Sequence, residues 1–327
     1  MQQISGAPQM KRVLVTGAAG QIGSELVPSL RKLLGSENVI AAGHINPLPE
    51  DVRNSGPFTQ IDVTKYDEID AALKKYDIDT LYHLASILSA LAEMKRQLSY
   101  DVNFNGLYQA LEAASNNNLE RVMVVSSIGA FGLRTPKNPT PNDTIQDPNT
   151  IYGISKVFTE LMGNYYNDKL GLDVRGVRLP GIISWKTEPT AGTTDYAVEI
   201  FYGAIKEQKY TCFLGPDTRL PLMYIPDAIK SLIDLSEADI AGLKHHSDFN
   251  VNSLSITPSE LANAIKEKIP EFQIDYDIDP LRQSIADSWP DALDDTAARK
   301  EWNWNPEYDL EKMVDDMLEN LTEKLIK

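Results

Sequence analysis

The sequence of 327 residues predicts an α/β fold in which a doubly wound parallel sheet is joined to a smaller α/β lobe. Three observations support this prediction. Short β-rich runs alternate with helical patterns over the first half of the chain, which is typical of a parallel sheet covered on both faces. The first of these runs leads directly into a turn with three evenly spaced glycines. The alternation ends after Leu179, where a segment rich in Gly, Pro and Thr begins.

The main sheet is predicted from six short runs that are rich in β-branched and other apolar residues. They cover residues 11–16, 38–42, 58–63, 80–84, 121–126 and 174–179. Between these runs, apolar residues recur at intervals of three and four, which predicts helices that pack on the sheet. The helices cover residues 21–34, 66–75, 99–116 and 152–169. Crossovers of this kind are right-handed almost without exception.

Beyond Leu179 the pattern predicts four more helices and one returning strand. The helices cover residues 198–207, 224–238, 258–268 and 310–326. Asp227 is placed as the N-cap of the second helix, and Thr257 opens the third. Residues 249–251 are expected to return a strand to the main sheet.

Composition excludes several classes of function. The net charge of −16 argues against nucleic acid or an anionic membrane as a partner, because like charges repel. The apolar runs are too short for a transmembrane helix. The single cysteine, Cys212, fits a reducing compartment and predicts a cytoplasmic protein. His83 is expected to be structural and His245-His246 to lie in an exposed loop, and no cluster predicts a metal site.

The stretch "VLVTGAAGQIG" predicts a dinucleotide-binding turn. Gly17 permits the tight turn, Gly20 leaves room for a pyrophosphate, and Gly23 lets the helix pack closely on the strand. The start of the helix, with Gln21 and Ile22, offers N–H groups and a positive dipole end to the phosphates. The alternative is a glycine-rich turn without a ligand. The position of the turn after the first strand of an α/β pattern favours a Rossmann fold.

The pair in "YGISK" points to proton transfer. Tyr152 and Lys156 are four residues apart, so a helix places them on one face, where the ammonium is expected to lower the pKa of the phenol. A phenolate can take a proton from an alcohol. A surface Tyr and Lys are the ordinary alternative. Upstream, however, "VVSSIGAFG" places Ser126 and Ser127 at the carboxyl end of a parallel strand, where such sheets bind ligands.

These motifs, together with "HLAS" and Asp62-Val63, resemble the extended short-chain dehydrogenase/reductase superfamily. Three longer stretches are similar to the epimerase-like L-threonine 3-dehydrogenases of that superfamily. They are "HLASILSA" at 83–90, "RLPGIISWKTEPTAGTTDYAVEIFYGAI" at 178–205 and "SWPDALDDTAARKEW" at 288–302. The resemblance covers essentially the whole chain after Met10.

The resemblance implies NAD-dependent oxidation of the L-threonine β-hydroxyl to 2-amino-3-oxobutyrate, a step of threonine catabolism towards glycine or aminoacetone. Tyr152 would be the general base, and Lys156 would hold the nicotinamide ribose. Ser127 would hydrogen-bond the hydroxyl, with Ser126 as a second candidate for that role. Further matches to cofactor-binding positions are Asp62, Val63, Leu84, Ala85, Ser126, Pro180 and Ile182. Asn103 matches a structural asparagine.

For the amino-acid substrate, the resemblance implies Ser89, Thr193, Thr194 and Trp289. Short hydroxyls and backbone N–H groups suit a carboxylate, and an indole can cover a small molecule. The alternative for the two threonines is an ordinary turn whose Asp195 caps the following helix. A packed loop tryptophan is the alternative for Trp289.

The pattern and the resemblance together divide the chain. Residues 1–9 are expected to be a disordered extension, and 10–181 to form the NAD-binding Rossmann domain, with returning pieces near 222–253. Residues 182–221 and 254–327 are expected to form the substrate-binding lobe. In the superfamily, helices equivalent to 99–116 and 152–169 pair in a four-helix bundle, so a homodimer is expected.

One expected residue is missing. Dinucleotide folds that select NAD usually end the second strand with an acid that accepts from the ribose 2′-hydroxyl, but here Gly43 stands at that position, followed by His44. We therefore expect NAD to remain the cofactor with weaker discrimination against NADP. His44 and Arg53 are the candidate partners of a 2′-phosphate.

Two other functions remain open from the sequence alone. A nucleotide-sugar epimerase or dehydratase would share the sheet, the glycines and the Tyr/Lys pair, but it needs cations for a diphosphate. A non-catalytic dinucleotide sensor would share the glycines, although such proteins commonly lose the Tyr or the Lys, and this chain keeps both.

Overall fold

The computed structural model describes residues 10–189 and 192–326, so the predicted extension at 1–9 lies outside the described residues. Within them, seven parallel strands form the main sheet in the order β10-β6-β5-β4-β1-β2-β3. The strands are β1 (Val13–Thr16), β2 (Val39–Gly43), β3 (Phe58–Gln60), β4 (Thr80–His83), β5 (Arg121–Ser127), β6 (Val174–Leu179) and β10 (Phe249–Asn250). The predicted doubly wound sheet and its returning strand are confirmed.

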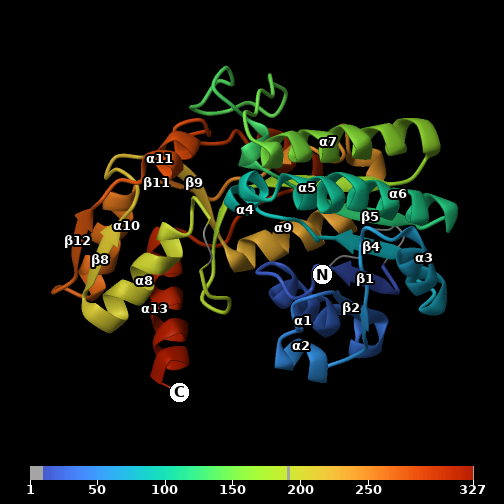
Figure 1. Cartoon of the computed structure of the whole chain (residues 1–327), viewed down its shortest axis with the longest axis horizontal. Coiled ribbons are helices and arrows are strands. Elements are labelled where there is room, and N and C mark those ends of the chain that lie inside the picture. Colours follow the sequence, from blue (N-terminus) through green and yellow to red (C-terminus); the bar gives the residue numbers. More distant parts are fainter. Residues whose placement is uncertain (1–9, 190–191, 327) are drawn as a thin grey trace.

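Helices cover both faces of this sheet (Figure 1). Successive strand residues point to opposite faces, and since both sets are apolar here, each face packs against helices. Val13 and Val15 of β1 face α1 (Gly23–Leu34) and α9 (Ile225–Glu237), and these elements share one apolar core. Leu14 faces the opposite core, which is closed by α3 (Tyr66–Lys75), α6 (Leu107–Asn116) and α7 (Ile151–Tyr165).

Two of the predicted long helices contain wider turns. The region 99–116 consists of the end of α5 (Arg96–Ser99), the π-helical segment η2 (Tyr100–Gly106) and α6. Helix α7 likewise continues into the π-helical segment η4 (Tyr166–Leu170). π-helical turns are rare in proteins, but those that occur are often found at functional sites. The segment η2 contains Asn103.

The remaining residues build a smaller part beside the sheet (Figure 1). Its strands are β7 (Gly181–Ile183), β9 (Leu220–Tyr224) and β11 (Leu254–Ile256) in one sheet, and β8 (Lys209–Cys212) with β12 (Gln273–Tyr276) in another. Its helices are α8 (Tyr196–Glu207), α10 (Pro258–Lys268), α11 (Pro280–Ala286) and α13 (Leu310–Ile326), whereas α12 (Thr296–Trp302) packs against β10 of the main sheet. The two short helices α2 (Glu50–Asn54) and α4 (Ser89–Met94) belong to the side of the main sheet.

One local prediction is wrong, and another is confirmed only in part. The N-cap of α9 is Tyr224, and the Asp227 carboxylate instead accepts hydrogen bonds from the N–H groups of Glu307 (2.7 Å) and Tyr308 (3.2 Å). Asp227 therefore holds the chain that leads into α13. His245 and His246 do lie in a loop, but they are only partly exposed, and the His245 ring lies between the carboxylates of Glu301 and Asp143.

Candidate active site

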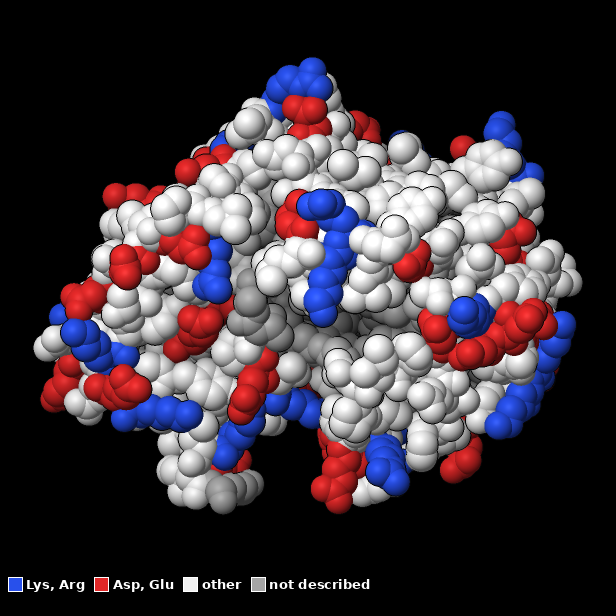
Figure 2. Space-filling view, in the orientation of Figure 1, with Lys and Arg blue, Asp and Glu red and all other residues white. Residues whose placement is uncertain are grey.

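A cavity opens at the carboxyl ends of the central strands, between the main sheet and the smaller part, and it appears as the hollow in Figure 2. It lies at the point where the strand order reverses between β1 and β4, which is where open parallel sheets bind ligands. Its lining includes the predicted residues Gly17, Gly20, Gln21, Ile22, Gly23, Leu84, Ala85, Ser89, Ser126, Ser127, Tyr152, Lys156, Pro180, Ile182, Thr193, Thr194 and Trp289. Asp62 and Val63 are not part of this lining.

The glycine turn has the close packing that the sequence predicts. Gly17 has φ +70°, and a Cβ there would lie 2.7 Å from the backbone nitrogen of Ala85. A Cβ on Gly23 would lie 2.4 Å from the carbonyl oxygen of Gly17, so the helix start and the strand end could not approach as they do. No side chain caps the start of α1, which leaves this end available to an anion.

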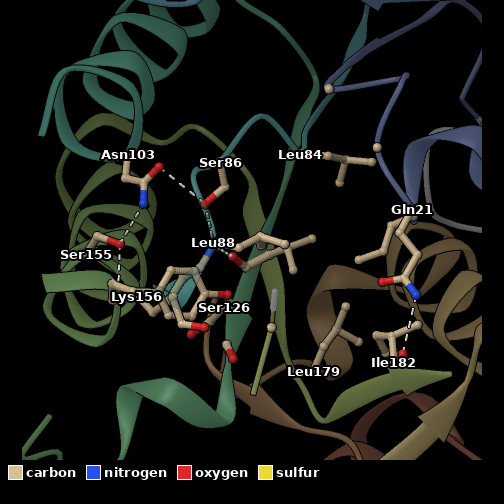
Figure 3. A pocket seen from close by; sticks show the side chains of 18 of the residues that line it. Gln21, Leu84, Ser86, Leu88, Asn103, Ser126, Ser155, Lys156, Leu179 and Ile182 are labelled. Atoms are coloured by element: carbon tan, nitrogen blue, oxygen red, sulfur yellow. Dashed lines mark hydrogen bonds between the residues drawn. The ribbon is translucent and has the colours of Figure 1, made fainter. Parts of the chain in front are cut away.

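Gln21 connects the two sides of the cavity. Its amide donates to the hydroxyl of Ser184 (2.8 Å) and to the carbonyl of Ile182 (3.3 Å), as the right side of Figure 3 shows for Ile182. The glycine turn is thus joined to β7 and the residue that follows it. Sequence reasoning placed Gln21 only at the helix start and missed Ser184.

Tyr152 and Lys156 lie together on α7, as the spacing predicts. The Lys156 ammonium is 5.2 Å from the centre of the Tyr152 ring and donates to the carbonyl of Val125 (2.9 Å) and to the hydroxyl of Ser86 (3.4 Å). The Ser127 hydroxyl accepts from the backbone N–H of Gly129 at 3.1 Å. Three side chains suited to proton transfer thus meet at the end of β5 and the start of α7.

The expected lowering of the Tyr152 pKa by Lys156 is not found in the protein alone. Burial raises the pKa of the phenol, and a hydrogen bond with Ser127 works in the opposite direction. Burial also lowers the pKa of Lys156 to about 8, although the negative charge of Glu160 acts to raise it. His83 has a pKa lowered to about 4, first by burial and then by Lys156, so its ring is neutral at physiological pH. It pairs with the Thr16 hydroxyl at 3.1 Å, which agrees with a structural role.

A network around Asn103 fixes this arrangement (Figure 3). The Asn103 side chain accepts from the N–H of Ile87 (2.7 Å) and donates to the Ser155 hydroxyl (3.3 Å), which in turn donates to the carbonyl of Tyr152 (2.6 Å). Ser86 connects the network to Lys156. Sequence reasoning missed Ser86 and Ser155, although both are part of the motifs "HLAS" and "YGISK".

The other predicted cofactor residues are placed as follows. The Ser126 hydroxyl donates to the carboxylate of Glu160 on α7. Asp62 follows β3, and its carboxylate accepts from the Thr64 hydroxyl (2.7 Å) and backbone N–H (3.0 Å). Burial would raise the Asp62 pKa, but these bonds and the charge of nearby His44 give it a net lowering.

The predicted substrate residues line the cavity from several segments of the chain. Ser89 begins α4, and Trp289 is buried. Thr193 is 1% exposed, and its hydroxyl has no hydrogen-bond partner among the described residues. Thr194 packs closely on Gly181, because a Cβ added to Gly181 would lie only 2.7 Å from the methyl carbon of Thr194. Burial without a partner is costly for a hydroxyl, so the Thr193 side chain is a candidate ligand group.

Residues 13–251 match the NAD dependent epimerase/dehydratase family. The chain belongs to this family. The family description names NAD, and the glycine turn, the uncapped start of α1 and the cavity that leads to Lys156 fit a dinucleotide. The predicted cofactor and the resemblance are therefore confirmed. Among the described residues no group of side chains could hold a metal ion, and no helix there is long and apolar enough to cross a membrane.

Solved structures of epimerase/dehydratase relatives are similar over nearly the whole chain. The X-ray structure of L-threonine dehydrogenase from Clostridium difficile is 49% identical, with a TM-score of 0.95, and the match covers 98% of this chain and 100% of that one. A monomeric L-threonine 3-dehydrogenase from a metagenome is 40% identical, with a TM-score of 0.91, over 95% and 99% of the two chains. An uncharacterized epimerase/dehydratase of Staphylococcus haemolyticus is 45% identical over 96% of this chain and 99% of its own length.

Proposed function

We propose that the protein oxidises the β-hydroxyl of L-threonine with NAD⁺ and forms 2-amino-3-oxobutyrate in the cytoplasm, as a step of threonine catabolism towards glycine or aminoacetone. The observation that carries the proposal is a single cavity that joins the glycine turn, the Ser127, Tyr152 and Lys156 group, and the buried Thr193 hydroxyl. The names of the solved relatives support threonine as the substrate.

The reaction needs a base for the hydroxyl proton and an acceptor for the hydride on the same carbon. When bound, NAD⁺ supplies the hydride acceptor. Tyr152 as phenolate takes the hydroxyl proton while the C–H bond breaks and the carbonyl forms. Ser127 donates to the reacting oxygen and keeps it near the phenol. Lys156 supplies positive charge beside the phenolate, which the burial of Tyr152 would otherwise disfavour.

The remaining residues take binding roles in this proposal. The 10–181 domain would hold NAD, with the phosphates at the start of α1. Residues 182–221 and 254–327 would hold the amino acid. The proposed phosphate, ribose and nicotinamide contacts are Gly17, Gly20, Gln21, Ile22, Gly23, Leu84, Ala85, Ser126, Pro180 and Ile182, and the adenine contacts are Asp62 and Val63. The proposed threonine contacts are Ser89, Thr193, Thr194 and Trp289.

The deciding experiment compares NADH formation from threonine with turnover of UDP-sugars. Lys156 is the one Lys or Arg among the described residues that line the cavity. The lining therefore offers few cations to bind the diphosphate of a nucleotide sugar. We expect NADH formation from threonine and no epimerised or dehydrated sugar. Turnover of a UDP-sugar alone would assign the protein to the nucleotide-sugar enzymes. Binding of NAD⁺ without turnover of any alcohol would make it a sensor.

The Thr193→Val variant tests the threonine pocket. Valine keeps the shape of the buried side chain and removes its unpartnered hydroxyl. We expect KM for threonine to rise about tenfold, the usual scale of one lost hydrogen bond, with Kd for NAD⁺ unchanged. Steady-state kinetics with calorimetry on NAD⁺ measures both. An unchanged KM would remove the Thr193 hydroxyl from substrate binding.

We further propose a homodimer through 99–116 and 152–169. Within 99–116, Ala110 and Leu111 are buried in the protein's own core, so they are not free for this contact. On α7, Ile154, Leu161 and Tyr165 are 50%, 62% and 52% exposed, and they form the apolar face that a second copy would cover.

Light scattering at micromolar concentration is expected to give a dimeric mass for the wild type and a monomeric mass for Leu161→Arg. Leu33→Arg on α1 is the matched control, because Leu33 is 54% exposed on a helix outside the proposed contact. A monomeric mass for the wild type would refute the dimer and would agree with the monomeric state of the metagenome relative.

A further inference from the structure

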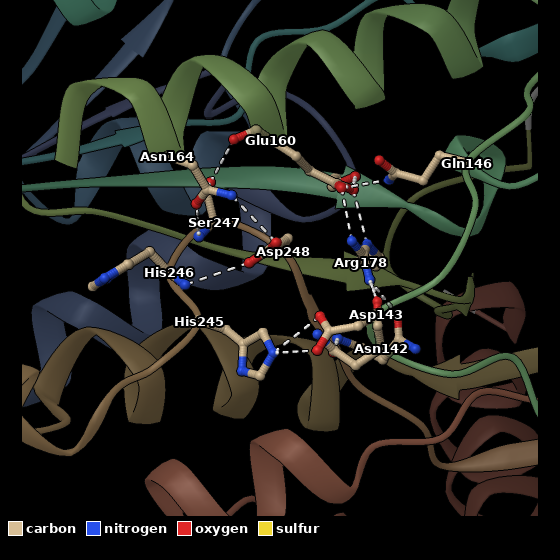
Figure 4. Close-up of polar contacts among 12 residues, drawn as sticks. Asn142, Asp143, Gln146, Glu160, Asn164, Arg178, His245, His246, Ser247 and Asp248 are labelled. Carbon is tan, nitrogen blue, oxygen red and sulfur yellow. Dashed lines mark hydrogen bonds and ion pairs between the residues drawn. The ribbon is translucent and has the colours of Figure 1, made fainter. Parts of the chain in front are cut away.

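A buried ion pair lies behind the cavity, outside its lining. Glu160 on α7 and Arg178 on β6 are joined by two hydrogen bonds, of 3.0 and 2.9 Å, and their side chains are 2% and 4% exposed (Figure 4). A buried pair of this kind often stabilises a fold no more than apolar residues of the same size would. The hydrogen bonds of Glu160 and Arg178 lead from this pair to the neighbourhood of the proton-transfer side chains.

The Glu160 carboxylate holds the end of β5. It accepts the hydroxyl hydrogen bond of Ser126, which stands between Val125 and Ser127. The carbonyl of Val125 holds the Lys156 ammonium, and Ser127 is the proposed partner of the reacting hydroxyl. Glu160 itself is one helical turn beyond Lys156. One carboxylate therefore connects the strand and the helix that carry all three proton-transfer side chains.

Arg178 extends the connection away from the sheet. Its guanidinium donates to the carbonyl of Asn142 (2.8 Å) and to the side chain of Asn250 (3.1 Å). The Asn250 amide in turn donates to the carbonyls of Thr140 (3.1 Å) and Asp294 (3.2 Å). The ion pair thus reaches the loop before α7 and the segment before α12.

The segment before α12 also contains Trp289, the residue predicted to cover the substrate. Thr140 donates its N–H to the carbonyl of Ala292 (2.8 Å) and accepts from the N–H of Asp294 (2.9 Å). Trp289, a few residues earlier, lines the cavity. Hydrogen bonds therefore run without a break from the end of β5, through the ion pair, to the segment of Trp289.

We propose that Glu160 and Arg178 are positioning residues of the reaction, which hold the proton-transfer group and the Trp289 segment in one arrangement. The inference rests on the proposed function, because that function assigns the proton transfer to Ser127, Tyr152 and Lys156. Small displacements of such groups reduce rates strongly, so the pair acts on kcat more than on binding.

The charges around Lys156 agree with this role. Tyr152 and Glu160 face it from α7 and His83 from β4, and the His83 ring is neutral. Burial lowers the pKa of Lys156 to about 8, and the Glu160 carboxylate opposes this lowering. The loss of the Glu160 charge would let Lys156 lose its proton at a lower pH.

The first test is Glu160→Gln, which keeps the shape of the side chain and removes its charge. We expect kcat with threonine to fall about tenfold or more, with Kd for NAD⁺ at pH 7 close to that of the wild type. NAD⁺ affinity should weaken as Lys156 deprotonates, and this weakening should occur at lower pH in the variant.

Ser126→Ala is the second test, because it leaves the ion pair intact and removes one connection to β5. We expect a fall in kcat of about threefold to tenfold. Ser231→Ala is the matched control, since Ser231 is also fully buried and its hydroxyl donates, at 2.7 Å, to a carbonyl of its own helix α9, outside the network of the ion pair. The control should lose a similar amount in Tm and keep the wild-type kcat.

The outcomes separate this inference from the proposed function. The pH dependence of NAD⁺ affinity needs no threonine, so it decides the role of Glu160 even if the wild type fails to oxidise threonine. If Glu160→Gln does not fold, Glu160→Gln/Arg178→Gln removes both charges together and is measured in its place. Variants that lower Tm but keep the wild-type kcat and pH profile would overturn the positioning role.

Discussion

Replacement of Tyr152 by phenylalanine is expected to lower kcat by about 10² or more, the usual scale for the loss of a general base. The phenylalanine ring keeps the packing at the start of α7, so the fold and Kd for NAD⁺ should not change. Turnover with threonine, circular dichroism and NAD⁺ calorimetry check the three expectations. Tyr108→Phe is the control, because Tyr108 is an exposed tyrosine on α6, outside the cavity lining.

The pH dependence gives an independent measure of the same residue. Phenolate is the active form, and burial raises the Tyr152 pKa, so kcat should climb as pH rises into the alkaline range. Lys156 must stay protonated, and its pKa lowered to about 8 sets an opposing limb. Near-normal turnover of the phenylalanine variant, or a rate independent of pH, would remove Tyr152 from the mechanism.

Replacement of Gly43 by aspartate is expected to tighten NAD⁺ binding about tenfold or more. A carboxylate at the end of β2 would accept from the ribose 2′-hydroxyl, and a charge-assisted hydrogen bond contributes roughly 1.5–3 kcal/mol. The structure tolerates the change, since the nearest atom to a Cβ there would be a Leu48 side-chain carbon at 3.4 Å, an ordinary contact. NADP⁺ should bind more weakly, because its phosphate would meet a like charge.

The measurement is kcat/KM for NAD⁺ and NADP⁺ at pH 7 and 8, with Gly43→Asn as the neutral control. Asparagine offers a hydrogen-bond acceptor without the charge, so it should improve NAD⁺ and leave NADP⁺ nearly unaffected. For the wild type we expect NAD⁺ to be preferred by a modest factor. A wild-type preference for NADP⁺ above tenfold would contradict this and would assign the 2′-phosphate to His44 or Arg53.

The sequence was sufficient for the centre of the main sheet because strands such as β1 and β2 are continuous, buried runs of mainly apolar residues. The same holds for Gly17, Gly23 and the Tyr152/Lys156 pair, whose roles depend on local spacing. The strands of the smaller part were missed. They have three to five residues, and some, such as β12, are partly exposed, so neither length nor periodicity distinguishes them from loops.

Contacts between distant segments explain the other differences. Asp227 is a residue type that favours the N-cap position. Its carboxylate, however, accepts hydrogen bonds from Glu307 and Tyr308, which lie 80 and 81 positions further along the chain. His245 is a loop histidine, as predicted, but Glu301 and Asp143, which are far from it in the sequence, partly cover its ring. The Tyr152 pKa is set by burial more than by the neighbouring lysine, and burial is a property of the assembled site.

The Gln21 bridge to Ser184 and Ile182 bears on the kinetics of cofactor exchange. A dinucleotide bound along the glycine turn, as proposed, would lie between the first turn of α1 and the residues after β7. Its departure would then require these two hydrogen bonds to break and the two sides to separate. Under that proposal the rate of NADH release depends on how often the enzyme opens, and opening would limit turnover when proton and hydride transfer are fast.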